Sequence, residues 1–345
     1  MNPEKVAMAR LACGFTQASF ATSIGISQSL LSKLEDGLRR DLPEDKLASM
    51  VSLTGFPETF FTREGGRRAM SDDLFRKSKA AGAKVLAQND ALVNIRRLEI
   101  ETLLPKVEFE TLPRPHCSVE DFAGGAREIA RNLRHAWRLD QGPIENLTKL
   151  AEDIGCIVIH FDFGTSKIDG LTSFANDGTP IIFLNPAFPA ARLRATLAHE
   201  IGHVIMHHFM TATADEEAWQ FAYELLMPER EIRPSLFPLN IDKLVLLKNK
   251  WKVSMQFILM WAREMGALKD GYFRVLMCQI SKRGWRKLEP FDGEWLIEQP
   301  TFLREIIDYH LKDLGYTEDE LRSSMAANER TFGPDYLGRP SFTVL

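Results

Sequence analysis

The residues best suited to chemistry are two histidines four positions apart, His199 and His203, with Glu200 directly after the first. Residues with this spacing lie on one face of an α-helix, so both imidazoles can bind the same Zn²⁺. A carboxylate at Glu200 stands beside such a site without being a ligand. There it can take a proton from an attacking water and return it to a leaving amine. The spacing therefore predicts a zinc site for amide hydrolysis, with Glu200 as the catalytic residue.

Apolar residues surround the motif and predict that its helix is buried; they are Leu197, Ile201, Val204 and Ile205. The alternative is a helix with its histidines on the solvent face. His207 follows one turn after His203 on the same face, where it could approach the zinc or a developing oxyanion. For a histidine in this position, a supporting or partly exposed role is more common.

A catalytic zinc site needs a third protein ligand. Asp215, Glu216 and Glu217 begin a downstream segment with helical periodicity. Its buried stripe is Ala218, Phe221, Ala222, Leu225 and Leu226. On a helix Asp215 points close to this stripe, Glu217 lies at its edge and Glu216 faces away. Carboxylates are also favoured at any helix N-terminus, so the pattern leaves the choice among the three open.

Short apolar runs before the motif predict the scaffold that carries it. Residues 156–161, 169–174 and 180–185 read as strands, and an Asn-Asp-Gly-Thr turn at 176–179 joins the last two. A small three-stranded sheet is therefore expected directly ahead of the motif helix. Further helices are expected at 85–104, 119–139 and 240–268, the last with a break at 253–255.

The N-terminal segment predicts two short helices joined by a tight turn. Thr16 and Ser27 can cap the helices, and Gly25 allows the left-handed turn between them. This is the pattern of a helix-turn-helix. The outer face of the second helix would carry Gln28, Ser29, Ser32 and Lys33.

Residues up to about 62 resemble the Cro/repressor-type (XRE) helix-turn-helix family. The resemblance implies that Gln28 and Ser29 contact DNA bases, while Gln17 and Lys33 contact the DNA backbone and Ser32 lies on the same face. Residues 1–70 carry almost as many acidic as basic side chains, which is a weak electrostatic footprint for DNA. A protein-interaction use of these helices is the alternative.

Two motifs flank the zinc-binding pattern: Phe-Leu-Asn-Pro at 183–186 and Phe-Ala-x-x-Leu-Leu-Met-Pro at 221–228. With Thr-Leu-Ala-His-Glu-Ile-Gly-His, they resemble the ImmA/IrrE family of zinc metallopeptidases over roughly residues 145–290. The resemblance implies Zn²⁺ as cofactor and a third ligand at Asp215, where the family carries glutamate. Either Asp215 binds zinc after a small helix shift, or Glu217 or Glu216 takes the role, or zinc binding is weaker.

The bulk properties are those of an ordinary globular chain. With 345 residues there is room for two or three domains, and a net charge of −4 favours neither nucleic acid nor membrane. The four cysteines form no C-x-x-C pair, and no apolar run reaches membrane-spanning length. We expect a cytoplasmic protein without a membrane partner.

The expected fold is α+β and mostly helical. It has an all-α helix-turn-helix domain at 1–65, a basic linker and long helices at 66–140, and a gluzincin-like metallopeptidase core with a helical extension at 141–290. C-terminal helices and a tail fill 291–345. The break at 253–255, within the helical segment 240–268, resembles another helix-turn-helix junction, but helices packed over the peptidase core are the simpler interpretation.

These features predict a DNA-binding regulator with a zinc-dependent endopeptidase domain. By family resemblance its substrate would be a partner repressor or antitoxin, cleaved to control transcription in stress or mobile-element induction. Paired DNA half-sites would make a homodimer possible. The alternatives are a transcriptional regulator or antitoxin whose peptidase-like domain is a non-catalytic sensor or interaction module, and a phage-encoded protein that binds protein partners.

Overall fold

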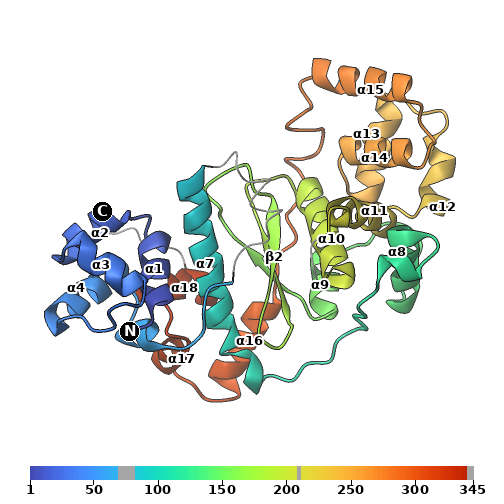
Figure 1. Ribbon diagram of the computed structural model, residues 1–345. Helices are drawn as coiled ribbons and strands as arrows, with labels where there is room; N and C mark the ends of the chain where they lie inside the picture. Colours follow the sequence, from blue (N-terminus) through green and yellow to red (C-terminus); the bar gives the residue numbers. More distant parts are fainter. Residues whose placement is uncertain (69–81, 208–210, 340–345) are drawn as a thin grey trace.

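The computed structural model describes residues 1–68, 82–207 and 211–339. The N-terminal helices lie at one end of the molecule, a three-stranded sheet occupies the middle, and a group of helices from residues 241–282 forms the other end (Figure 1). The fold is mostly helical α+β, as the sequence predicts.

The N-terminal helices form the predicted helix-turn-helix. Their bounds are α1 Pro3–Ala12, α2 Gln17–Ile24, α3 Gln28–Glu35, α4 Glu44–Thr54 and α5 Glu58–Thr62. Thr16 caps α2 in a reciprocal capping box with Ser19, and Ser27 caps α3. Gly25 ends α2 with a φ of 71°, a left-handed conformation that glycine adopts without steric cost.

The predicted strands are present as β1 Ile157–His160, β2 Gly170–Phe174 and β3 Pro180–Leu184. Their order is β1-β3-β2, with β3 parallel to β1 and antiparallel to β2. All five residues of the central strand β3 are buried, so both faces of the sheet are covered.

Helices cover the two faces of the sheet. Val158 and Ile182 belong to the core formed with α9 (Leu147–Asp153) and α10 (Ala190–Met206). Their strand neighbours point the other way, into the core formed with α7 (Ala83–Glu101) and α16 (Phe302–Lys312). The motif helix α10 thus rests on one face of the sheet (Figure 1).

Further helices are α8 Gly125–Ala136, α11 Ala214–Leu226, α12 Glu229–Ile232, α13 Ile241–Trp251, α14 Met255–Glu264 and α15 Asp270–Lys282. Of these, α11 packs on α10, α8 packs on α11, and α13, α14 and α15 pack on one another. The single helix expected at 119–139 is instead a 3₁₀ turn followed by α8, because Phe122 is extended and Gly125, the first residue of α8, has a φ of 59°. The break at 253–255 is present, and Ser254 caps α14.

The C-terminal helices α17 (Glu318–Met325) and α18 (Glu329–Leu337) return to the N-terminal domain. The Asn328 amide donates to the Thr54 carbonyl at 2.8 Å, and the Glu329 N–H donates to the Gly55 carbonyl at 3.0 Å. Arg330 donates to the carbonyls of Leu53 and Ser52 at 3.2 and 2.5 Å. The last helices therefore occupy the carbonyl end of α4.

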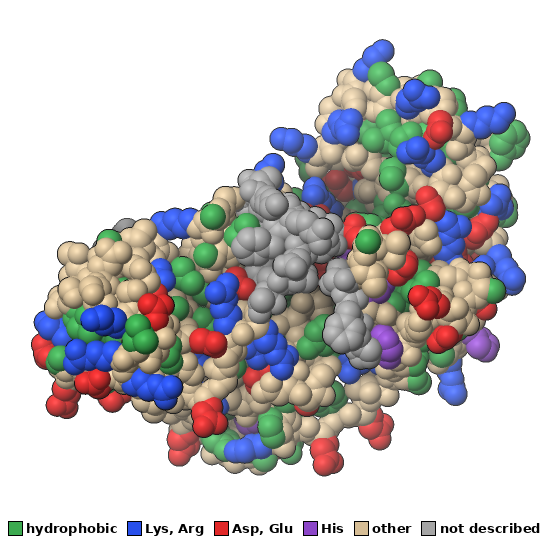
Figure 2. Space-filling model, viewed as in Figure 1, with side chains coloured by type: hydrophobic (Ala, Val, Ile, Leu, Met, Phe, Trp, Pro, Cys, Tyr) green, Lys and Arg blue, Asp and Glu red, His purple; other side chains and the backbone are tan. Residues whose placement is uncertain are grey.

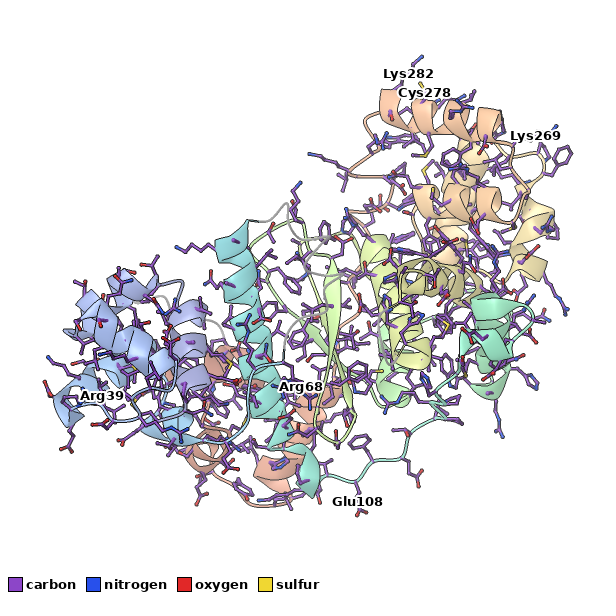
Figure 3. All side chains as sticks on the ribbon, in the orientation of Figure 1. Arg39, Arg68, Glu108, Lys269, Cys278 and Lys282 are labelled. Carbon is purple, nitrogen blue, oxygen red and sulfur yellow. The ribbon has the colours of Figure 1, made fainter. Side chains whose placement is uncertain are left out.

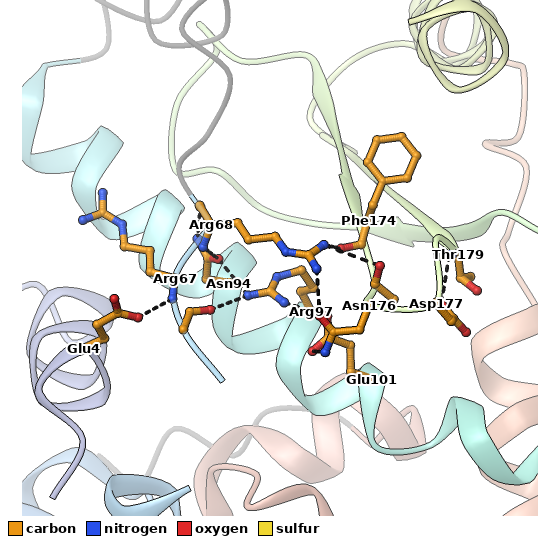
Figure 4. A network of polar contacts seen from close by, with 12 residues as sticks. Glu4, Arg67, Arg68, Asn94, Arg97, Glu101, Phe174, Asn176, Asp177 and Thr179 are labelled. Atoms are coloured by element: carbon orange, nitrogen blue, oxygen red, sulfur yellow. Dashed lines mark hydrogen bonds and ion pairs between the residues drawn. The ribbon is translucent and has the colours of Figure 1, made fainter. Parts of the chain in front are cut away.

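The segment that follows the helix-turn-helix is held in place, although its composition suggests a flexible hinge. The Arg67 N–H donates to Glu4, and the backbone of Arg68 exchanges hydrogen bonds with the Asn94 side chain (Figure 4). The Arg68 guanidinium reaches Asn176 in the β2–β3 turn at 2.7 Å. Figure 3 places Arg68 beside α7 in the middle of the molecule. Further basic side chains of this linker, Arg76, Lys77 and Lys79, lie outside the described residues.

The sequence also leads to expectations about the pairing of the cysteines and about membrane-spanning segments. All four cysteines are free, and Cys278 is exposed on the outlying helix α15 between Lys269 and Lys282 (Figure 3). Within the described residues, no helix combines the length and the apolar character needed to cross a membrane.

Candidate metal centre

The structure brings the two motif histidines together on the buried helix α10. His199 Nε2 and His203 Nε2 are 3.0 Å apart, and only 7 % of His199 is exposed. The Trp219 ring packs on the His199 ring, with 4.3 Å between their centroids. The alternative of histidines on a solvent-facing helix surface does not describe this arrangement.

Of the three acids at the start of α11, Asp215 lies next to the histidines. Its Oδ1 is 3.3 Å from His199 Nε2, and the donor atoms of Asp215, His199 and His203 lie within 4.8 Å of one another. Tetrahedral zinc with bonds near 2.0–2.2 Å holds neighbouring ligand atoms about 3.3 Å apart. The spacing and the His-His-carboxylate donor set therefore fit Zn²⁺.

The other two acids lie elsewhere. Glu216 is exposed. Glu217 contacts His207 instead of the donor cluster, with 2.9 Å between Glu217 Oε2 and His207 Nε2. His207 in turn lies behind His203, with 3.0 Å between the two Nδ1 atoms. Neither Glu217 nor His207 belongs to the group of three candidate ligands.

Glu200 is held by a residue that sequence reasoning missed. The Thr172 hydroxyl, from strand β2, donates to Glu200 Oε2 at 2.7 Å. Only 7 % of Glu200 is exposed, so this bond fixes a buried carboxylate next to the donor cluster. The sequence placed Thr172 in a strand ahead of the motif helix, but the strand pattern alone could not indicate which residue faces Glu200.

A glycine inside the motif allows α10 and α11 to approach closely. A Cβ atom at Gly202 would lie 3.2 Å from the Ala218 Cα and 3.2 Å from the Phe221 ring. Because the two helices meet at this point, the start of α11 reaches the histidines of α10. Gly202 therefore determines how near Asp215 can come.

Tyr223 is the phenol nearest to this region in sequence, and its surroundings favour a packing role. Its ring stacks on Trp261, with 5.3 Å between centroids and an interplanar angle of 5°. Burial raises the pKa of Tyr223 to about 12, so the phenol is protonated at neutral pH.

The predicted DNA-facing residues occupy the surface of α3. Gln28, Ser29 and Lys33 are exposed. Ser32 is half-buried and donates to Asp36 at 3.0 Å. On the face drawn in Figure 2, acidic and basic side chains are intermixed over the N-terminal helices.

Gln17, the predicted DNA-backbone contact, is engaged within the domain. Its amide donates to Glu35 Oε2 at 2.8 Å, and Glu35 also pairs with Arg10 at 2.6 Å. Gln17 thus helps to join α2 to α3. Its contact with DNA stays a prediction, as do those of the four α3 residues.

Comparison with known protein families identifies two domains. Residues 6–61 match the helix-turn-helix family, and residues 151–261 match a peptidase family described as the IrrE N-terminal-like domain. Searches of curated proteins and of solved structures found no significant match. The chain is therefore a helix-turn-helix domain joined to a metallopeptidase-like domain.

Proposed function

Because the chain joins a helix-turn-helix domain to an IrrE N-terminal-like domain, we propose that it is a DNA-binding regulator with a zinc-dependent endopeptidase activity. The observation that carries the proposal is the buried cluster of His199, His203 and Asp215. Glu200, which directly follows His199 in the sequence, is held by Thr172. A family match alone would be compatible with a domain that has lost its donor set.

Each residue of the site has its own role in the proposed reaction. His199, His203 and Asp215 would hold the zinc, which supplies activation of water and polarisation of the scissile carbonyl. Glu200 accepts the proton of the attacking water on its carboxylate and delivers it to the nitrogen of the leaving amine. The Thr172 hydroxyl keeps one oxygen of Glu200 in a fixed direction, which favours a single orientation for proton transfer.

We propose a protein as the substrate, specifically a partner repressor or antitoxin whose cleavage changes transcription in stress or mobile-element induction. The presence of DNA-binding and peptidase-like domains in one chain supports this. DNA contact is assigned to Gln28, Ser29, Ser32 and Lys33 on α3, and paired half-sites would be read by a homodimer.

The test is the metal content of the purified full chain. We expect about one zinc per chain, lost in His199→Ala and in Asp215→Ala. His135→Ala, which changes an exposed histidine on α8, is the matched control and should leave the zinc content unchanged. A wild-type protein that binds no zinc when supplied with the metal would overturn the proposal.

A non-catalytic sensor or interaction domain is the second candidate, favoured by the aspartate at 215 in place of the family's glutamate. Glu200→Gln separates the two functions, since it removes the proton acceptor and leaves the three candidate ligands in place. Loss of regulation and of partner cleavage, with zinc retained, would support the endopeptidase. Unchanged regulation would support the sensor.

A further inference from the structure

A chain of side-chain contacts leads from a carboxylate on α11 to the metal-binding face of α10. Glu217 Oε2 lies 2.9 Å from His207 Nε2, and His207 Nδ1 lies 3.0 Å from His203 Nδ1. On the other side of its ring, His203 Nε2 faces His199 Nε2 at 3.0 Å. The side chain of His207 is only 4 % exposed, so this chain is shielded from solvent at its centre.

The Glu217 carboxylate determines which ring nitrogens of His207 and His203 carry a hydrogen. An ionised carboxylate only accepts hydrogen bonds, so His207 Nε2 must carry the hydrogen that points at Glu217. In neutral His207 the other nitrogen, Nδ1, is then an acceptor. The hydrogen that it accepts is the one on His203 Nδ1, which leaves His203 Nε2 with a lone pair directed at the donor cluster.

Zinc binding by His203 independently requires the same positions of the ring hydrogens. A histidine that binds zinc through Nε2 is neutral and carries its hydrogen on Nδ1. That hydrogen needs an acceptor when the ring is buried, and His207 Nδ1 is in place at 3.0 Å. The Glu217 carboxylate and the zinc site therefore require the same positions for the hydrogens on the His207 and His203 rings.

We propose that Glu217 and His207 are positioning residues that hold His203 in the tautomer and orientation of a metal ligand. This inference rests on the proposed zinc site and adds a function for two residues outside it. It also assigns Glu217 a different role from that of third ligand: its carboxylate acts on the metal through two imidazole rings.

The two motif histidines are oriented by different kinds of contact. His199 Nδ1 is buried and has no hydrogen-bond partner among the described residues. The His199 ring is oriented by its contact with Trp219 instead. Polar orientation thus concentrates on His203, which makes the affinity of the site sensitive to His207 and Glu217.

The experiment measures Zn²⁺ affinity of the full chain by competition with a chromophoric chelator. Loss of an outer hydrogen-bond partner typically weakens metal binding 10–100-fold, and we expect about this loss for His207→Ala and for Glu217→Ala. The double variant should lose no more than His207→Ala alone, because both act through one path. His207→Asn, whose side-chain oxygen can accept from His203 Nδ1, should recover part of the affinity.

Two controls separate positioning of His203 from a general effect on the fold. Glu216→Ala changes the exposed neighbour and should bind zinc as the wild type does. Thermal unfolding of each variant in excess chelator measures the stability of the metal-free protein, and zinc affinities are compared among variants that are fully folded at the assay temperature. The Co²⁺ absorption spectrum reports whether the ligand set is preserved.

The outcomes distinguish this inference from the proposed function. If the wild type binds zinc and both alanine variants bind equally tightly, the positioning role is wrong and the zinc site stands. If Glu217→Ala abolishes binding while Asp215→Ala has no effect, Glu217 is itself the third ligand. A wild type that does not bind zinc overturns both proposals.

Discussion

At the scale of single residues, the candidate metal centre is built from side chains that are oriented by different kinds of contact. His199 is fixed by the Trp219 ring, His203 by a hydrogen-bonded imidazole, and Glu200 by a threonine hydroxyl. These supports come from α11, α10 and β2, so three elements must be correctly packed before the motif has its shape. Each support can be removed separately.

Thr172→Val removes the hydroxyl that donates to Glu200 and keeps nearly the same side-chain volume. Because the Glu200 carboxylate then loses this hydrogen bond, we expect peptide hydrolysis to fall about 10–150-fold, since a lost hydrogen bond to a charged group is worth roughly 1.5–3 kcal/mol. Hydrolysis of a quenched fluorescent peptide measures this. Zinc affinity should be unchanged, as should the activity of Ser173→Ala on the same strand. An equal loss of zinc in Thr172→Val would contradict the assignment.

A second prediction concerns Lys5, which is 1 % exposed in the N-terminal domain. Burial, together with the positive charges of Arg63 and Arg97, lowers the pKa of Lys5 to about 8. Between this value and the unfolded value of 10.5, the unfolded state binds more protons, so stability rises with pH across that window. Lys5→Met should stabilise the protein by about 1–3 kcal/mol at pH 7 and abolish the rise.

Urea unfolding at pH 7, 8.5 and 10 checks the prediction for Lys5. Lys84→Met, at an exposed position on α7, is the control and should leave the pH profile of the wild type intact. A Lys5→Met profile parallel to that of the wild type would show that Lys5 does not cause the rise.

At the scale of helices and strands, the sequence predicts the elements that short residue patterns determine. The apolar run of β3 and the Asn-Asp-Gly turn before it were sufficient for the hairpin, and the caps Thr16 and Ser27 were sufficient for the helix-turn-helix. The strand order β1-β3-β2 was not predictable, because alternation identifies a strand and not its neighbours. Which of Asp215 and Glu217 lies beside the histidines likewise depends on how the two helices pack, which the sequence pattern does not give.

Gly202 sets the distance between α10 and α11. In Gly202→Ala the new methyl meets the Ala218 backbone at 3.2 Å, so the two helices must separate. Overpacking of this kind costs about 1–3 kcal/mol, which exceeds the helix-propensity gain of about 1 kcal/mol from replacing glycine. We expect lower stability in urea and weaker zinc binding, because Asp215 moves with α11.

Gly271→Ala on α15 is the matched control for this helix contact. Nothing lies within 4 Å of a Cβ atom there, so the substitution should be neutral or slightly stabilising. If Gly202→Ala behaves as Gly271→Ala does, the contact between α10 and α11 is not tight enough to place Asp215.

At the scale of the whole molecule, α7 joins the two domains (Figure 1). One side of the helix supplies Ala91, Ile95 and Leu98 to the core of the N-terminal domain. The other side supplies Val93 and Ile100 to the core beneath the sheet. Helical periodicity predicted α7 but could not reveal two partners, since a helix that is buried all round shows no single apolar face.

The contacts from α18 to α4 lead to a prediction about this coupling. Asn328→Ala and Arg330→Ala remove hydrogen bonds to the carbonyls of residues 52–54. We expect faster amide hydrogen exchange at the C-terminal end of α4, with little change in the sheet. Arg322→Ala, which removes the ion pair with Asp319 within α17, should leave exchange at α4 unaltered. Unchanged exchange in the first two variants would show that the C-terminal helices do not stabilise the N-terminal domain.

The same contacts impose an order of events during synthesis. Asn328 and Thr54 are 274 positions apart, so at roughly 5–20 residues per second the ribosome needs on the order of 15–55 seconds between them. During that interval the helix-turn-helix can pack against α7, but the side chains that bond to the carbonyl end of α4 do not yet exist. The helix-turn-helix surface therefore emerges from the ribosome well before the hydrogen bonds that hold the carbonyl end of α4 can form.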